Sequence, residues 1–416
     1  GRDGQLNIIY WQAPSILNPY LSGGTKDLES ASMIIEPLAR YDSTGALVAF
    51  LAEEIPTVGN GGVSEDLTSI TWKLKSGLLW SDGSPVTSAD VAFTAEYCMH
   101  PEGGCAQASK FDGVQSVEAI DDLTIKVTFN SPKPNPYGPF AGAQSPIIQK
   151  AQFAECLGAK APECTDANFM PIGTGPFVVT DFRTNDVIQM EANSNYRDPN
   201  KPAFATVTFK GGGDATAAGR AVMETGEFDY AWNMQLAPDV LAAMAEGGVG
   251  TPISAFGTLV ERIEMNLTNP SPDLPEGERA TVAHPHSFLS DFAVRHALSM
   301  AIDRSLLVEV GYGQAGRPTC NLVPGPEIYA STDNTGCLTQ DLEGAKALLD
   351  EAGWAVDTSG VRRNAAGEAL ELSFLYNSSS SDTLSGIVEN FISNVDALGA
   401  KLKLESVDSS QYTARR

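Results

Sequence analysis

The six cysteines are the residues whose spacing most clearly implies a chemistry. They form three close pairs along the chain: Cys98 with Cys105, Cys156 with Cys164, and Cys320 with Cys337. No pair has the Cys-x-x-Cys spacing typical of zinc and redox sites. An even number of cysteines in local pairs favours three disulfide bonds formed in an oxidising compartment. Free buried thiols are the alternative, because sequence alone does not give the pairing.

The four histidines and the numerous carboxylates indicate no catalytic centre. His284-Pro285-His286 offers two imidazoles to a metal ion, although an exposed pair without a metal is the commoner outcome in a proline-rich loop. No His-Glu-x-x-His or Gly-x-Ser-x-Gly sequence occurs. With 52 acidic residues, any choice of two as general acid and base would be arbitrary. We therefore predict that the protein is not an enzyme and has no cofactor and no metal site.

Two glycine-rich segments resemble nucleotide-binding loops only in part. Gly311-Tyr312-Gly313-Gln314-Ala315-Gly316 has the dinucleotide spacing, but a predicted helix precedes it and Arg317-Pro318 follows, which favours a turn. Gly211-Gly212-Gly213-Asp214 leads into a predicted helix without the Gly-Lys-Ser or Gly-Lys-Thr of a phosphate-binding loop. A turn that permits close packing is favoured there, with anion binding by backbone amides as the alternative.

Aromatic side chains beside polar ones are better candidates for a binding site. Tyr10-Trp11-Gln12 and the segment from Tyr230 to Gln235 each follow or end a predicted strand. In α/β domains ligands bind at strand ends, in clefts with apolar walls and a few polar anchors. Core packing is the alternative for each aromatic residue. The predicted ligand-binding residues are Trp11, Gln12, Tyr20, Thr25, Tyr230, Trp232, Asn233 and Gln235. We expect Trp232→Ala to weaken ligand binding far more than it lowers thermal stability.

Several segments predict the elements that would position these side chains. A strand is expected over residues 5–11 and a helix over 28–40. Short strands then dominate up to residue 129, interrupted by one helix that Thr87 would cap. Further expected strands cover 177–179, 187–190, 206–210 and 261–267, and further helices cover 88–99, 214–224, 291–303 and 341–352. This mixture predicts an α/β fold.

Size and charge restrict the class of protein. A chain of 416 residues exceeds what one hydrophobic core usually holds, so two or more lobes are expected. The formal net charge of -25 argues against nucleic acid or an anionic membrane surface as partner. No apolar run approaches the roughly 20 residues that span a bilayer. The polar start Gly1-Arg2-Asp3-Gly4 is what a removed signal peptide would leave, as would a cytosolic or trimmed chain.

A series of collinear segments resembles the family 5 extracytoplasmic solute-binding proteins, which deliver peptides, nickel complexes and some oligosaccharides to ATP-driven (ABC) importers. The strongest match is Trp80-Ser81-Asp82-Gly83 within residues 71–91. Leu17-Asn18-Pro19-Tyr20 precedes it, and Gly173-Thr174-Gly175-Pro176-Phe177 follows. The other matching segments are residues 35–42, 51–54, 117–122, 193–196 and 294–304.

The resemblance implies a two-lobed fold of the periplasmic-binding-protein type (type II) with an extra domain inserted in the first lobe. The implied domains are residues 1–45 and 170–255 for lobe I, 46–169 for the inserted domain, and 256–416 for lobe II, incomplete at its C-terminal end. In such proteins a peptide or similar polar oligomer binds between the lobes and is delivered to a membrane permease. A monomer on the periplasmic or extracellular face, with or without a lipid anchor, is expected. A nickel-chelate or haem carrier, a ligand-sensing receptor and a secreted hydrolase are the alternatives.

Overall fold

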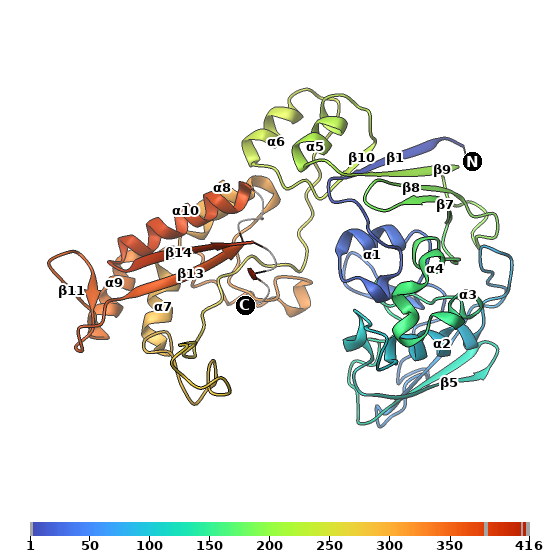
Figure 1. Cartoon of the computed structure of the whole chain (residues 1–416), viewed down its shortest axis with the longest axis horizontal. Helices are drawn as coiled ribbons and strands as arrows, with labels where there is room; N and C mark the ends of the chain where they lie inside the picture. The colour runs from blue at the N-terminus through green and yellow to red at the C-terminus, as the bar shows by residue number, and fades with distance from the viewer. Residues whose placement is uncertain (1–2, 378–381, 409–410, 413–416) are drawn as a thin grey trace. The chain divides into compact units, whose positions relative to one another are not determined.

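The computed structural model describes residues 3–377, 382–408 and 411–412 (Figure 1). The chain divides into two compact units, Gly1–Met234 and Gln235–Arg416. The sequence expectation placed the second lobe from residue 256 and an inserted domain at 46–169. Those boundaries remain predictions, and each unit is described below by itself.

A five-stranded sheet with the order β10-β1-β9-β8-β7 forms the centre of unit 1. Its strands are β1 (Gln5–Tyr10), β7 (Phe177–Arg183), β8 (Val187–Ala192), β9 (Thr206–Gly211) and β10 (Tyr230–Trp232). β1 pairs parallel with both β9 and β10, whereas β7, β8 and β9 are antiparallel neighbours. Alternating apolar residues on these strands fill one buried cluster on the sheet.

Two helices accompany this sheet, α1 (Thr25–Ala31) and α5 (Ala215–Met223), and they lie on opposite sides of it (Figure 1). α5 begins where expected, because the carboxylate of Asp214 accepts a hydrogen bond from the amide of Ala217 at 2.7 Å. A Cβ on Gly211 would lie 2.1 Å from that of Ala13, so this glycine permits close packing.

The predicted helix over residues 28–40 is wrong in its second half. α1 ends at Ala31, and residues Ala39–Tyr41 form strand β2, which pairs with β3 (Leu47–Ala49). The apolar spacing continued past Ala31 because Ile34 packs in the core. The carbonyl oxygen of Ile34 accepts a hydrogen bond from the Gly175 amide at 2.7 Å, so a tertiary contact replaces the helical one.

A buried ion pair joins two of the segments that carry the family resemblance to Arg197, which directly follows a third. Arg197 donates to both carboxylate oxygens of Glu36, at 2.5 and 3.2 Å, and the Thr174 hydroxyl donates to the same carboxylate at 3.0 Å. Glu36 is fully buried. A buried carboxylate is stable only when its oxygens are paired in this way. The ion pair therefore connects three segments that are distant in the sequence.

The rest of unit 1 contains a three-stranded antiparallel sheet, β4-β6-β5, and helix α2 (Ser88–Met99). The strands are β4 (Ser69–Lys73), β5 (Val114–Asp121) and β6 (Thr124–Phe129). α2 is capped as predicted by Thr87, whose amide donates to the Asp90 carboxylate at 2.9 Å. The short helices α3 (Lys150–Phe153) and α4 (Thr165–Phe169) complete this part.

Unit 2 is built from helices around a second buried cluster. The helices are α6 (Pro238–Ala245), α7 (Phe292–Met300), α8 (Arg304–Gly311), α9 (Leu342–Glu351) and α10 (Asp382–Ala397). The strands are β11 (Ala355–Val356), β12 (Arg362–Arg363), β13 (Glu371–Asn377) and β14 (Lys401–Val407), of which β13 and β14 pair in parallel.

Two expectations for unit 2 have different outcomes. The predicted strand over residues 261–267 is wrong, because this segment pairs with no other strand among the described residues. Its alternation reflects Ile263 and Met265, which pack against the core without a ladder. The glycine-rich segment at 311–316 follows α8, as expected for a turn rather than a dinucleotide loop.

Three disulfide bonds join the cysteines in the close pairs seen in the sequence. They are Cys98–Cys105, Cys156–Cys164 and Cys320–Cys337, with Cα atoms 5.2, 5.8 and 5.7 Å apart. These separations are within the range that a disulfide requires. The bonded cysteines are 7, 8 and 17 positions apart in the sequence, so each bond constrains a local segment.

Candidate functional site

The candidate site lies at the carboxyl ends of the parallel strands β10, β1 and β9. Tyr10 is in register with Trp232 on one side and with Gly211 on the other. The residues that follow these three positions therefore reach the same edge of the sheet. Sheet edges of this kind are where α/β domains bind ligands. We call this edge, with the side chains beside it, the strand-end site.

A hydrogen bond joins the ends of β1 and β10. The indole Nε1 of Trp11 donates to the backbone oxygen of Asn233 at 2.9 Å. Asn233 has a φ of 49°, in the left-handed region that asparagine tolerates better than most residues. The side chains of Gln12 and Asn233 are exposed at this edge. The sheet thus brings four of the predicted binding residues together. They are Trp11, Gln12, Trp232 and Asn233.

Trp232 itself is largely a core residue. Its ring stacks on that of Tyr10 with centroids 4.8 Å apart and planes 16° from parallel, and 8% of the residue is exposed. Tyr10 in turn packs edge-on against Phe209 at 5.2 Å. This burial favours the core-packing alternative for Trp232, so we now expect Trp232→Ala to lower stability strongly.

Tyr230, the first residue of β10, presents an accessible aromatic surface two residues before the strand end at Trp232. It is 51% exposed. Burial raises the pKa of Tyr230, and the nearby carboxylate of Glu29 raises it further. The hydroxyl of Tyr10 donates to Glu29 Oε2 at 3.4 Å. Glu29, exposed on α1, therefore lies beside Tyr10, although no sequence pattern singles it out.

The remaining predicted residues lie elsewhere. Tyr20 is fully buried, and its hydroxyl donates to the Pro146 carbonyl oxygen at 2.5 Å, so it packs in the core and has no surface for a ligand. Thr25 is exposed at the first position of α1. Gln235 is exposed and opens the second unit.

Asp27 fixes the start of α1 close to Tyr20 and Thr25. Its buried carboxylate accepts hydrogen bonds from the Ser15 amide at 2.7 Å, the Ser22 hydroxyl at 2.7 Å and the Lys26 ammonium at 2.8 Å. Burial alone would raise the pKa of Asp27, but these hydrogen bonds outweigh burial and lower it. Asp27 is therefore a charged structural anchor.

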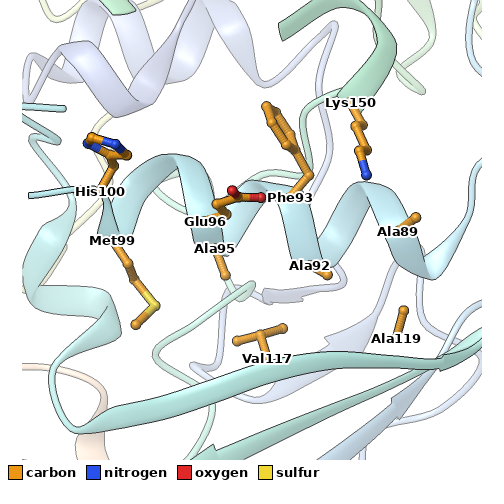
Figure 2. A pocket seen from close by; sticks show the side chains of 10 residues that line it. All are labelled: Ala89, Ala92, Phe93, Ala95, Glu96, Met99, His100, Val117, Ala119 and Lys150. Carbon is orange, nitrogen blue, oxygen red and sulfur yellow. The ribbon is translucent and has the colours of Figure 1, made fainter. Parts of the chain in front are cut away.

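A separate groove of about 600 Å³ lies between α2 and β5 (Figure 2). In Figure 2, Ala92 and Met99 lie on the side of α2 that faces β5, which carries Val117 and Ala119. Glu96, His100 and Lys150 are the ionisable residues at this groove. None of the predicted binding residues lines it, so we assign no ligand to it.

The described residues contain no group of three or more histidine, cysteine, aspartate or glutamate side chains that could hold a metal. His284 Nε2 lies 2.9 Å from a carboxylate oxygen of Glu278. His286 Nδ1 accepts hydrogen bonds from the amides of Phe288 and Leu289, at 3.3 and 3.1 Å. Both imidazoles thus have partners within their own loop. Within the described part of the chain, no helix has the length and apolar character to cross a membrane.

Comparison with known proteins identifies relatives over most of the chain. The model of the bacterial extracellular solute-binding proteins, family 5 (Middle), matches residues 46–416. Protein XP55 of Streptomyces lividans is 28% identical over 84% of this chain and 57% of its own length. The glutathione-binding protein GsiB of Escherichia coli strain K12 is 25% identical over 81% of this chain and 59% of its own length. The matches thus span less than two thirds of these two relatives.

The solved structures support the fold. The ABC transporter substrate-binding protein CtaP of Listeria monocytogenes superimposes with a TM-score of 0.74 at 24% identity. The match covers 100% of this chain and 76% of that structure. The architecture is therefore the α/β two-lobed one expected from the sequence.

Proposed function

Since the chain belongs to the family 5 bacterial extracellular solute-binding proteins, we propose that it acts as the substrate-binding component of an ABC importer. The ligand is a peptide or a similar polar oligomer, and a membrane permease receives it. The family consists of extracytoplasmic binding proteins, and three disulfide bonds suit an oxidising compartment. On this proposal the protein binds its ligand without converting it.

The strand-end site is the observation that carries this proposal. It combines a half-exposed ring, Tyr230, with the amide side chains of Gln12 and Asn233. Aromatic surfaces accept side chains of varied shape, whereas amides can pair with both the donors and the acceptors of a peptide backbone. Such a combination suits a ligand with a constant backbone and variable side chains.

The rival functions have less support. A nickel-chelate or haem carrier would gain from metal ligands, but the described residues contain no cluster of them, and His284 already pairs with Glu278. For a secreted hydrolase, no nucleophile beside a base occurs at the strand-end site as described above. Incubation with a mixed peptide and glycan pool tests the hydrolase directly, because a binding protein leaves the pool unchanged.

Native mass spectrometry of the gently purified protein is the first test. A discrete additional mass, identified after denaturation as a peptide or polar oligomer, supports the proposal. Titration calorimetry with that ligand then compares Tyr230→Ala with Tyr41→Ala, a matched control because Tyr41 is 52% exposed outside the strand-end site. We expect Tyr230→Ala to weaken binding at least tenfold and Tyr41→Ala to leave it unchanged. Equal effects, or a released metal chelate, would contradict the proposal.

A further inference from the structure

Three cationic side chains from separate segments of unit 1 surround Phe50, the residue that follows β3. The guanidinium carbon of Arg40, on β2, lies 4.0 Å from the centre of the Phe50 ring, and that of Arg197 lies 4.6 Å from it. The ammonium group of Lys75 donates to the backbone oxygen of Phe50 at 2.7 Å. All three cations thus contact one residue, and we call Arg40, Lys75 and Arg197 the cation cluster.

One carboxylate, that of Glu36, accompanies the cation cluster. Glu36 pairs with Arg197, whereas the Arg40 guanidinium has a single hydrogen bond, to the Ser32 carbonyl oxygen at 3.1 Å. Among the residues that the structure describes, neither Arg40 nor Lys75 forms an ion pair with a carboxylate. The cluster therefore combines three positive charges with one negative charge, in a chain whose formal net charge is -25.

The cation cluster is partly accessible to solvent. The Arg197 side chain is 21% exposed, and Arg40, Phe50 and Lys75 are partly buried. Burial lowers the pKa of both Arg40 and Lys75, and the charge of Arg197 lowers both pKa values further. A second anion beside these groups would oppose both effects, because an opposite charge favours the ionised form. The electropositive edge of the Phe50 ring would add to the attraction.

We propose that the cation cluster binds a doubly charged oxyanion of the phosphate class. Guanidinium groups donate paired hydrogen bonds to such oxyanions, and a lysine ammonium supplies a compact positive charge. A phosphate group carries a charge of about −1.5 to −2 near pH 7, which matches the two cations that lack a carboxylate. A monocarboxylate would compensate only one of them. This inference is independent of the proposed function, because no residue of the cluster belongs to the strand-end site.

Titration calorimetry of the protein with sodium phosphate, sulfate and acetate tests the inference. The ionic strength is held constant, because salt screens exposed charges. We expect saturable binding of phosphate and sulfate at a single site, about tenfold tighter than binding of acetate, which corresponds to about 1.4 kcal/mol. Glycerol phosphate distinguishes the sources of the anion. Retained affinity assigns the site to the phosphate group of a larger molecule, and lost affinity assigns it to the free ion.

Substitutions assign the binding to the cluster. Arg40→Gln should weaken phosphate binding at least tenfold, and Lys75→Gln several-fold. Lys126→Gln, the same charge change at an exposed residue of β6 outside the cluster, should leave it unchanged. Thermal unfolding verifies that the variants fold. Lys75→Gln is the milder change, because its amide can still donate to the Phe50 backbone oxygen.

Three results would overturn the proposal. They are the absence of saturable phosphate binding by the wild type, an affinity for acetate equal to that for phosphate, and equal effects of Lys75→Gln and Lys126→Gln. The last result would show that phosphate responds only to the overall charge of the protein.

Discussion

Trp232→Ala distinguishes core packing from ligand contact at the end of β10. The residue is 8% exposed and stacks on Tyr10. A buried tryptophan removes about 150–250 Å² from water. At about 25 cal/mol per Å², its loss forfeits roughly 4–6 kcal/mol of hydrophobic stabilisation. Partial collapse of the cavity brings the expected cost to about 3–5 kcal/mol.

Differential scanning calorimetry measures this cost directly. Unit 1 ends at Met234, and for a unit of that size each kcal/mol lowers the Tm by roughly 2–4 °C. The transition of unit 1 should therefore move down by about 6–20 °C in Trp232→Ala. Tyr230→Ala, which removes a half-exposed ring two residues earlier, should move it far less. A Tm for Trp232→Ala within about 2 °C of the wild type, together with a loss of affinity, would refute the placement of Trp232 in the core.

Three further changes test other parts of the structure. Gly173→Ala places a Cβ 1.9 Å from the carbonyl oxygen of Ile34, so we expect a loss of several kcal/mol in denaturant unfolding; an unchanged midpoint would contradict this packing. The pKa of Asp27 is lower in the folded protein than in the unfolded chain, where it is near 4. The charged carboxylate therefore stabilises the fold above about pH 4, and this contribution is lost as the pH falls through the pKa of the folded protein. The stability difference between wild type and Asp27→Asn should therefore shrink below about pH 4, and a difference independent of pH would exclude the charge as its cause. Replacing Cys320 and Cys337 by serine should cost roughly 3 kcal/mol in the unfolding of unit 2, whereas an unchanged transition would show that this disulfide constrains nothing.

Regular elements with clear local signals could be predicted from the sequence. α2 has the predicted bounds because Thr87 and Asp90 form a capping box ahead of an apolar run. β9 and β1 differ from prediction by one residue because their alternation ends at a turn. In the two failures, at residues 28–40 and 261–267, the apolar spacing was real. At Ile34 a hydrogen bond from Gly175, far away in the sequence, replaces the helical one. At 261–267 Ile263 and Met265 pack against the core without a neighbouring strand.

The candidate site could be predicted only in part. The position of Trp11 and Asn233 follows from the rule that strand ends of α/β domains meet at one edge. Burial distinguished Tyr20 from Tyr230, and no local pattern reveals that difference. Glu29 has no sequence signal at all, because an acidic residue on a short helix is usually a solvated surface group. Its place beside Tyr10 follows only from the approach of α1 to the end of β1.

The position of β1 in the sheet also determines when unit 1 can fold during synthesis. Ile8 pairs with Tyr230, so the first strand of the chain needs partners made more than 200 residues later. At about 5–20 residues per second, β1 waits roughly 10–45 s for β10 to be synthesised. Long-range pairing of this kind slows folding. The nascent chain therefore keeps β1 without its β10 partner until residues 230–232 have been synthesised.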